Sequence, residues 1–187
     1  MSGLTMYAAS VPVFDRYLAR LSALLGLAEQ HAAAQGLAAE ALLQARLSPS
    51  MFPLAVQVEI AANFSLRACA PLAGLAVPDT TRPPASFEGL QQHIAMARAL
   101  LAGLTPAQMA GSDTRECSSR AGNGLVRLPG CEFLLQYALP NFFFHLGMAY
   151  AILRQSGVAI GKSDFDGFHD YPPAGGLSAP ASAPSSP

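Results

Sequence analysis

The amino-acid sequence predicts an all-α fold: a four-helix bundle with a short β-hairpin before the last long helix and a disordered carboxyl-terminal tail. Three observations support this fold class. Four long segments repeat apolar residues at spacings of three and four, the period of a helix that buries one face. Glycines and prolines interrupt the pattern between these segments. Finally, Gly122-Asn123-Gly124 separates two short runs, as the turn of a hairpin does.

The first half of the chain supplies two of the long helices. The first helix is expected to begin near Thr5 and to end by Gly36, and a short alanine- and leucine-rich helix over 38–45 follows it. The next long helix is expected to start near Ser50 and to stop at Gly74.

A proline-rich connection and two capping residues define the next elements. Residues 77–84, with the sequence VPDTTRPP, contain too many turn formers for a helix, so we expect a surface connection. Ser86 is a suitable cap for the third long helix, which stops at Gly103. Thr105 and Pro106 then open about two further helical turns.

The hairpin and the last long helix complete the domain. The two strands are expected over 114–118 and 125–128, and the last long helix over 130–157. We expect residues 1–167 to form one helical domain and residues 168–187 to form a flexible tail. The tail is rich in proline, serine and alanine, and it cannot bury enough apolar area to offset the entropy lost on ordering.

Composition excludes several classes of function. A net charge of -1 and a pI near 6.4 provide no basic footprint, so we expect no nucleic-acid binding. Polar residues or prolines interrupt every apolar segment, so we expect no membrane span. The amino terminus does not resemble a secretory signal, and we expect a cytoplasmic protein. Hydrophobic residues make up 51% of the chain and charged residues 12%, which is compatible with self-association.

The reactive residue types show no catalytic pattern. Cys69, Cys117 and Cys131 are odd in number and widely spaced, so we expect reduced thiols. No serine or cysteine stands in a recognisable nucleophile motif, and we identify no catalytic residue and expect no cofactor. His93 is expected on a solvated helix face, and His169 in a solvated terminus.

The most informative segment is YALPNFFFHLGMAYAILRQSGV, residues 137–158, an apolar helix with polar residues inside it. Tyr137, Asn141 and His145 are spaced four apart and therefore lie along one helix face. An amide and a neutral imidazole each offer a donor and an acceptor. Gln57, Asn141 and His145 could thus satisfy one another in the core, or they could line a ligand pocket with Tyr137.

The chain resembles the bacterial domain-of-unknown-function family DUF1993. The resemblance runs from about Met6 to Gly167 through the blocks MYAASVPVF, HAAAQGL, LLQARLSPSMFPLAVQV, ALPNFFFH, AYAILRQSGV and GKSDF. That family is in turn similar to the DinB/YfiT-like superfamily of four-helix bundles. The resemblance implies a divalent metal held by three histidines, two of them four apart on the last helix.

The three-histidine pattern is not complete in this chain. His145 matches one histidine of the pair, but Asn141 replaces the other, and Gln57 occupies the equivalent place on the second long helix. Amide oxygens are weak ligands for zinc or nickel. We therefore expect no metal site.

Three functions remain open from the sequence. The first is a non-catalytic protein that binds a small polar ligand through Gln57, Tyr137, Asn141 and His145, with Phe52, Phe64 and Phe142 as apolar walls. The second is a metal-dependent enzyme similar to thiol transferases or isomerases of the superfamily, in which His145 acts with a carboxylate such as Glu59 or Glu132. The third is a structural bundle that binds a partner protein.

The run Phe142-Phe143-Phe144 gives a hypothesis about assembly. Three consecutive residues on a helix point in three directions, so at least one ring faces away from the core. Either the hairpin or a second copy of the chain must cover that ring. We expect a homodimer contact on this basis.

Overall fold

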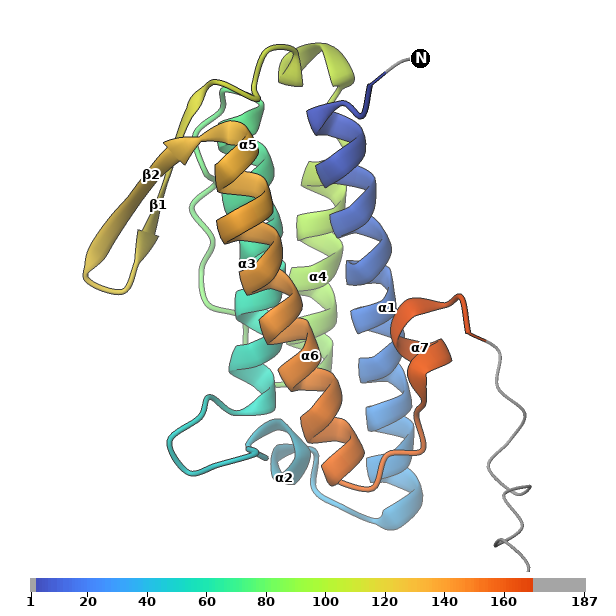
Figure 1. Cartoon of the computed structure of the whole chain (residues 1–187). Helices are drawn as coiled ribbons and strands as arrows, with labels where there is room; N and C mark the ends of the chain where they lie inside the picture. Colours follow the sequence, from blue (N-terminus) through green and yellow to red (C-terminus); the bar gives the residue numbers. More distant parts are fainter. Residues whose placement is uncertain (1–2, 170–187) are drawn as a thin grey trace, which may run out of the picture.

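The computed structural model describes residues 3–169, and its long helices run side by side in a bundle (Figure 1). The elements in chain order are α1 (Met6–Gln35), α2 (Ala39–Leu43), α3 (Leu54–Leu72), α4 (Phe87–Ala102), η1 (Pro106–Met109), β1 (Glu116–Ala121), β2 (Gly124–Pro129), α5 (Gly130–Glu132), η2 (Phe133–Ala138), α6 (Leu139–Gln155) and α7 (Lys162–Asp166).

The described residues are mainly helical, as predicted, and the total number of helices exceeds four. Helices α1, α3, α4 and α6 have between 16 and 30 residues. The short helices α2, α5 and α7 join or extend them. Within residues 3–169 no helix combines the length and apolarity that crossing a membrane requires.

Side-chain caps fix the helix ends close to the predicted positions. The Thr5 hydroxyl accepts a hydrogen bond from the Ala8 N–H at 3.1 Å, and Gly36 ends α1 with a φ of 63°. The Ser86 hydroxyl accepts from the Gly89 N–H at 3.0 Å at the start of α4. Helix α3 starts at Leu54, later than the predicted start near Ser50, because a residue that precedes a proline disfavours the helical conformation.

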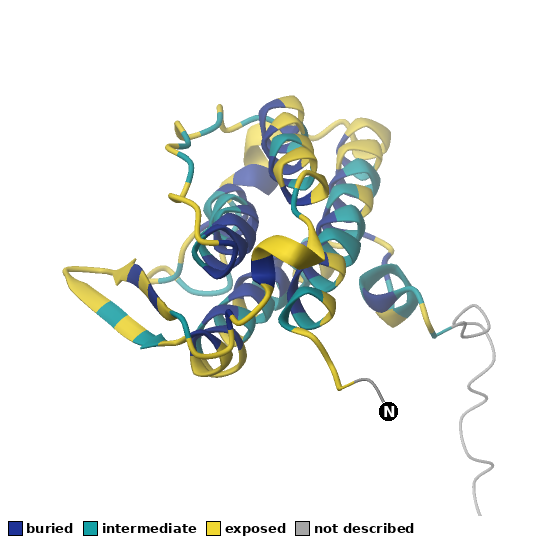
Figure 2. Cartoon of the chain, turned by 90° about the horizontal axis from the view of Figure 1, so that it is seen from above, coloured by how far each residue is buried: buried dark blue, intermediate teal, exposed yellow. Residues whose placement is uncertain are grey.

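The core lies between the four long helices. Seen from above in Figure 2, the buried parts of the helices face one another and the exposed parts face outward. Helix α3 packs against both α4 and α6. Phe14 of α1 and Phe142 of α6 are fully buried and meet edge to face, with ring centroids 4.9 Å apart. These rings connect the two helices through the centre.

The last long helix is continuous but not regular. Residues 133–138 form the π-helical stretch η2, which leads directly into α6. Pro140 follows at the start of α6, and a proline ring collides with the carbonyl four residues before it in a regular helix. A wider turn just before Pro140 relieves that collision and alters the direction of the side chains on η2.

The predicted hairpin is present, with different strand bounds. Strands β1 and β2 pair antiparallel from Glu116 opposite Pro129 to Ala121 opposite Gly124. Gly122 begins the two-residue turn with a φ of 57°, a value that favours glycine. The hairpin stands beside α3 and η2 (Figure 1).

The carboxyl-terminal end of the described chain contains a helix that the sequence did not predict. Helix α7 begins after Gly161, whose N–H donates to Asp164, and ends at Gly167 with a φ of 69°. It packs against α1. The flexible tail predicted over 168–187 lies outside the described residues from position 170 onward.

Candidate functional site

A buried pair formed by Gln57 of α3 and His145 of α6 is the centre of the candidate site. The Gln57 Oε1 and His145 Nδ1 atoms are 2.7 Å apart. An amide oxygen can only accept, so Nδ1 carries the hydrogen and Nε2 is left with its lone pair. The Gln57 amide nitrogen donates to the Phe52 carbonyl at 3.1 Å, which fixes the orientation of the amide. The predicted contact between Gln57 and His145 is therefore present.

Aromatic rings enclose His145 on two sides. The Phe64 ring is nearly parallel to the imidazole, with ring centroids 5.9 Å apart. The Phe144 ring is perpendicular to the imidazole, with ring centroids 5.2 Å apart. Burial lowers the pKa of His145, and the positive charge of Arg67 lowers it further. The imidazole is consequently neutral at pH 7.

Asn141 and Tyr137 do not complete the predicted network. The Asn141 amide donates to the backbone carbonyl of Tyr137 at 2.7 Å, one turn earlier in the helix. This local bond removes the need for a partner on another helix. The Tyr137 ring packs against Phe64 at 5.8 Å, so Tyr137 and His145 meet the same ring without a hydrogen bond between them.

Arg67 is a central residue that the sequence did not single out. Its Nε and Nη2 atoms donate to the Ser119 hydroxyl of β1 at 3.0 and 2.7 Å, and Nη2 also lies 3.3 Å from the Tyr137 hydroxyl. The Arg120 carbonyl accepts a further bond. The guanidinium carbon lies 4.6 Å from the centre of the Phe64 ring. Arg67 thus joins α3 to the hairpin and to η2.

The donor set at His145 does not fit the metal implied by the superfamily. One imidazole is present, its Nδ1 is engaged by Gln57, and the Asn141 amide is turned toward a backbone carbonyl. Glu59 pairs with Arg82 at 3.1 Å instead of reaching His145, and Glu132 is exposed at the start of the last helix. Within residues 3–169, no three histidine, cysteine, aspartate or glutamate side chains are grouped as metal ligands.

A second buried histidine corrects a sequence prediction. His93 of α4 is 6% exposed, where the sequence predicted a solvated face. Its Nε2 atom lies 2.9 Å from the Asn63 Oδ1 atom of α3, which also accepts from Thr80 at 3.3 Å. Burial lowers the pKa of His93, while the charge of Glu59 acts in the opposite direction. The 77–86 connection covers this pair, which explains the burial.

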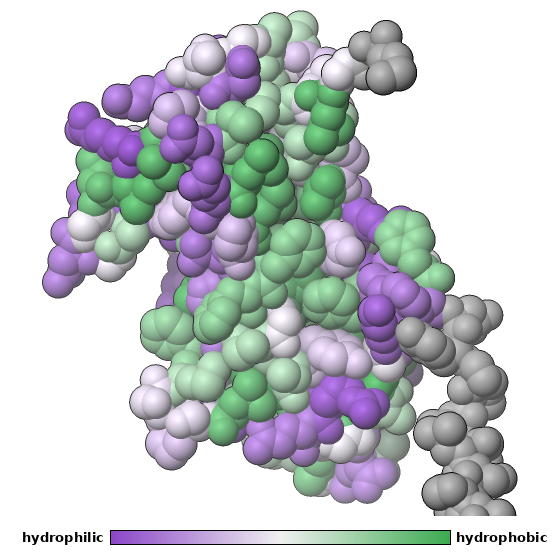
Figure 3. All heavy atoms as spheres, viewed as in Figure 1, coloured by the Kyte–Doolittle hydropathy of each residue, from purple (hydrophilic) through white to green (hydrophobic). Residues whose placement is uncertain are grey.

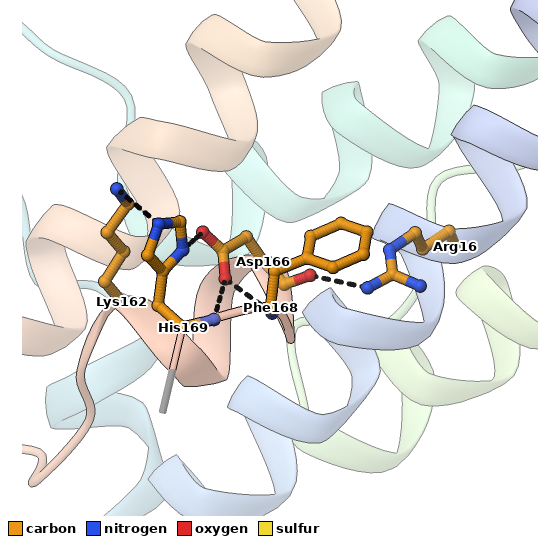
Figure 4. Close-up of polar contacts among 5 residues, drawn as sticks. All are labelled: Arg16, Lys162, Asp166, Phe168 and His169. Atoms are coloured by element: carbon orange, nitrogen blue, oxygen red, sulfur yellow. Dashed lines mark hydrogen bonds and ion pairs between the residues drawn. The ribbon is translucent and has the colours of Figure 1, made fainter. Parts of the chain in front are cut away.

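The end of the described chain forms an ordered polar cluster, shown in Figure 4. The Asp166 carboxylate accepts from the Phe168 N–H at 2.9 Å and from His169 Nδ1 at 2.5 Å. The backbone bond from Phe168 is the main reason that the pKa of Asp166 is lowered. Arg16 donates to the Asp166 carbonyl and stacks on the Phe168 ring at 3.9 Å. His169 is therefore part of a cluster that attaches α7 to α1.

A pocket at the start of α3 is separate from His145. It has a volume of about 530 Å³ and lies between the start of α3 and the connection to α4, where Phe52, Arg46 and the pair Glu59–Arg82 line it. Phe142 is fully buried against Phe14 and does not line this pocket. The three predicted walls Phe52, Phe64 and Phe142 therefore do not converge on this cavity.

Exposed apolar side chains also lie on the last helix, on η2 and on the hairpin. Phe144 is 52% exposed, and Leu135 of η2 and Leu125 of β2 are exposed as well. Figure 3 shows hydrophobic residues over this face of the molecule. The hairpin does not cover Phe144, so the predicted homodimer contact remains a prediction.

The fold and the comparisons define the class of protein. Its structure is similar to the crystal structure of a DinB family member protein from Shewanella denitrificans, with a TM-score of 0.80 and 33% identity over 89% of this chain and 94% of that chain. It is a DinB-like helical protein. The family model described as domain of unknown function (DUF1993) matches residues 6–166, and the chain belongs to this family. Among curated proteins no relative matches.

Proposed function

We propose that this protein binds a small polar ligand without catalysis, at a position that metal ligands occupy in the superfamily. The four long helices act as the scaffold, and His145 supplies the recognition group. The observation that carries the proposal is the fixed, neutral imidazole: Gln57 holds Nδ1–H at 2.7 Å, which leaves Nε2 as an acceptor.

The ligand in this proposal binds at the Nε2 atom of His145. Within residues 3–169, the buried side-chain nitrogen and oxygen atoms without a partner are Arg16 Nε and Ser112 Oγ. Nε2 of His145 is not one of them and has no protein hydrogen bond, so this atom is not fully enclosed although the side chain as a whole is buried. The exposed Phe144 ring stands at right angles to the imidazole and provides an apolar rim. A ligand with a hydrogen-bond donor beside a small apolar group suits this arrangement.

In this proposal His145 contacts the ligand and Gln57 holds His145 in position, while Tyr137 and Asn141 shape the helix around the site. The Phe64 ring connects Tyr137 to His145, so a change at either residue reaches the other through packing. The protein acts in the cytoplasm, and the Phe144 surface makes a homodimer contact. Sedimentation that shows a strict monomer at high concentration contradicts the dimer without affecting the ligand site.

A second candidate is catalysis with His145 as a general base. Its support is the same Nδ1–H bond, because it leaves the basic nitrogen free in a ring that is neutral at pH 7. However, no serine, cysteine or carboxylate within residues 3–169 is hydrogen-bonded to His145. A purely structural bundle is the third candidate, and it predicts that Nε2 meets only water.

Phenol is a suitable probe, because it combines one hydroxyl donor with an apolar ring, and anisole is its control without the donor. In an NMR titration we expect phenol to shift the His145 ring and the Phe144 resonances in a saturable manner, and anisole to act more weakly. His145→Phe should abolish the effect and His93→Gln should retain it. Absence of a saturable shift at the solubility limit, or equal shifts by anisole, contradicts the proposal.

A further inference from the structure

A second pocket, of about 510 Å³, lies between the hairpin, α3 and the connection from α3 to α4. Its lining includes two arginines, two serines, an aspartate and exposed apolar side chains; Arg67, Arg120, Ser119, Asp79, Val77 and Leu125 are among them. This volume is within the range of sites for small organic molecules. His145 does not line it, so it is distinct from the ligand position proposed above.

Arg67 is held in place before any ligand arrives. The Ser119 hydroxyl accepts from two of its nitrogens, the Tyr137 hydroxyl lies beside Nη2, and the Phe64 ring supports the flat face of the guanidinium. A guanidinium that is already oriented loses little side-chain entropy when it binds an anion.

No carboxylate within residues 3–169 forms an ion pair with Arg67. Within residues 3–169 the carboxylates that form ion pairs with arginine engage Arg82, Arg98 and Arg127. Arg67 donates instead to neutral oxygens, and its Nη1 has no partner there and is not enclosed. Its uncompensated charge also reaches His145, whose pKa it helps to lower. One pair of N–H donors is therefore available to a carboxylate or phosphate oxygen.

The other groups around the pocket define the ligand more narrowly. Two arginines and one aspartate leave an excess of one positive charge, which favours a monoanion over a dianion. Val77 and Leu125 are 40% and 53% exposed and offer an apolar surface beside the charges. A carboxylate attached to a small apolar group matches both features, whereas a phosphate monoester carries more charge than the pocket balances.

We propose that the pocket between the hairpin and α3 binds a small organic carboxylate, with Arg67 as the anchor and Val77 and Leu125 as the apolar contact. Binding places the carboxylate on the open side of the guanidinium, opposite the Ser119 hydroxyl. The hairpin contributes two residues to this site: Ser119 positions Arg67, and Leu125 contacts the ligand.

Benzoate is the probe, and benzamide is the uncharged molecule of the same shape. In an NMR titration of the full chain we expect benzoate to shift the Arg67 Nε–H and the Leu125 methyl resonances in a saturable manner, with a weaker effect of phenyl phosphate. Benzamide should bind at least about tenfold more weakly, because a hydrogen bond from a guanidinium to a charged oxygen is stronger than one to a neutral oxygen. Equal binding of benzamide, or no saturation by benzoate at its solubility limit, overturns the proposal.

Three variants distinguish direct binding of the anion by Arg67 from a general effect on the stability of the hairpin. Arg67→Gln should weaken benzoate binding by about tenfold or more. Leu125→Ala leaves every Arg67 contact in place and should weaken binding by a few-fold. Arg127→Gln is the matched control, because Arg127 lies on the same hairpin, pairs weakly with Glu116 and does not line the pocket. If Arg127→Gln weakens binding as much as Arg67→Gln, or if Leu125→Ala has no effect, the assignment is wrong.

Discussion

The two buried histidines of this protein have the same local chemistry and different surroundings. His145 bonds to the Gln57 amide and His93 bonds to the Asn63 amide, and both amides come from α3. Two aromatic rings and the cation of Arg67 surround His145. A carboxylate, Glu59, lies near His93, and the 77–86 connection covers it. A hydrogen bond to an amide can therefore satisfy a buried imidazole, while the neighbouring groups determine what else the imidazole can do.

The largest expected effect concerns the ring that stacks on His145. Phe64→Ala removes a buried ring and should lower the free energy of unfolding by about 3–5 kcal/mol. Phe144→Ala, at an exposed ring, should cost less than about 1 kcal/mol. Urea denaturation measures both. Phe64→Ala should also raise the pKa of His145 by admitting water, without a change at His93. A large shift at both histidines would show that they share one environment.

The sequence could predict the Gln57–His145 contact because both residues interrupt apolar helix faces that must pack together. It could not predict that Asn141 turns to the Tyr137 carbonyl, because an amide in a helix has a local and a distant partner, and only packing decides between them. Periodicity likewise gave the long helices and their caps, but Pro140 widened the last helix before α6.

His93 was misplaced for a different physical reason. A proline-rich segment such as 77–84 predicts a connection between helices, but it does not predict which helices the connection packs against. In the structure Thr80 bonds to Asn63 and Arg82 pairs with Glu59, so the connection folds onto α3 and α4 and buries His93. Arg67 was missed because a single arginine on a helix is usually solvated, and its partners Ser119 and Arg120 come from a hairpin that is distant in sequence.

The next effect tests whether the two amide bonds are equivalent. Gln57→Leu leaves the Nδ1–H of His145 without a partner, and Asn63→Leu does the same to His93 and Thr80. Each should cost about 1–3 kcal/mol in thermal or urea unfolding. The double variant Gln57→Leu/His145→Leu should recover part of the loss, because no polar group then remains unpaired. If Gln57→Leu leaves the free energy of unfolding unchanged, the bond between Gln57 and His145 is not formed in solution.

Stability should depend on pH through both histidines. Each has a native pKa below the ordinary value of 6.5, so below pH 6.5 the unfolded chain binds protons that the native chain does not. Their stabilisation is complete above pH 6.5 and is lost as the pH falls from 6.5 through the native pKa values. His145→Gln and His93→Gln should each flatten part of this decline, as measured by urea unfolding between about pH 7.5 and about pH 5.5, roughly one unit on either side of the ordinary histidine pKa. If the free energy of unfolding falls with pH equally steeply in both variants and in the wild type, the two histidines are not the source of the pH dependence.

The smallest effect separates the two histidines by the sign of the neighbouring charge. Arg67→Gln removes a cation and should raise the pKa of His145, while the pKa of His93 stays constant. Glu59→Gln removes an anion and should lower the pKa of His93, while that of His145 stays constant. Both shifts should be small, because solvent partly screens each charge. Proton NMR of the imidazole C–H resonances resolves them, and shifts of the same sign would contradict the comparison.

The most direct test of the central claim is the tautomer of His145, measured by imidazole ¹⁵N NMR on the dialysed full chain with and without added zinc or nickel. We predict a neutral ring with hydrogen on Nδ1 at pH 7.5, lost in Gln57→Leu and unaltered by equimolar metal. A metal that survives dialysis in stoichiometric amount and shifts the Nε2 resonance of His145 would contradict the claim that an amide has replaced the metal as the partner of this imidazole.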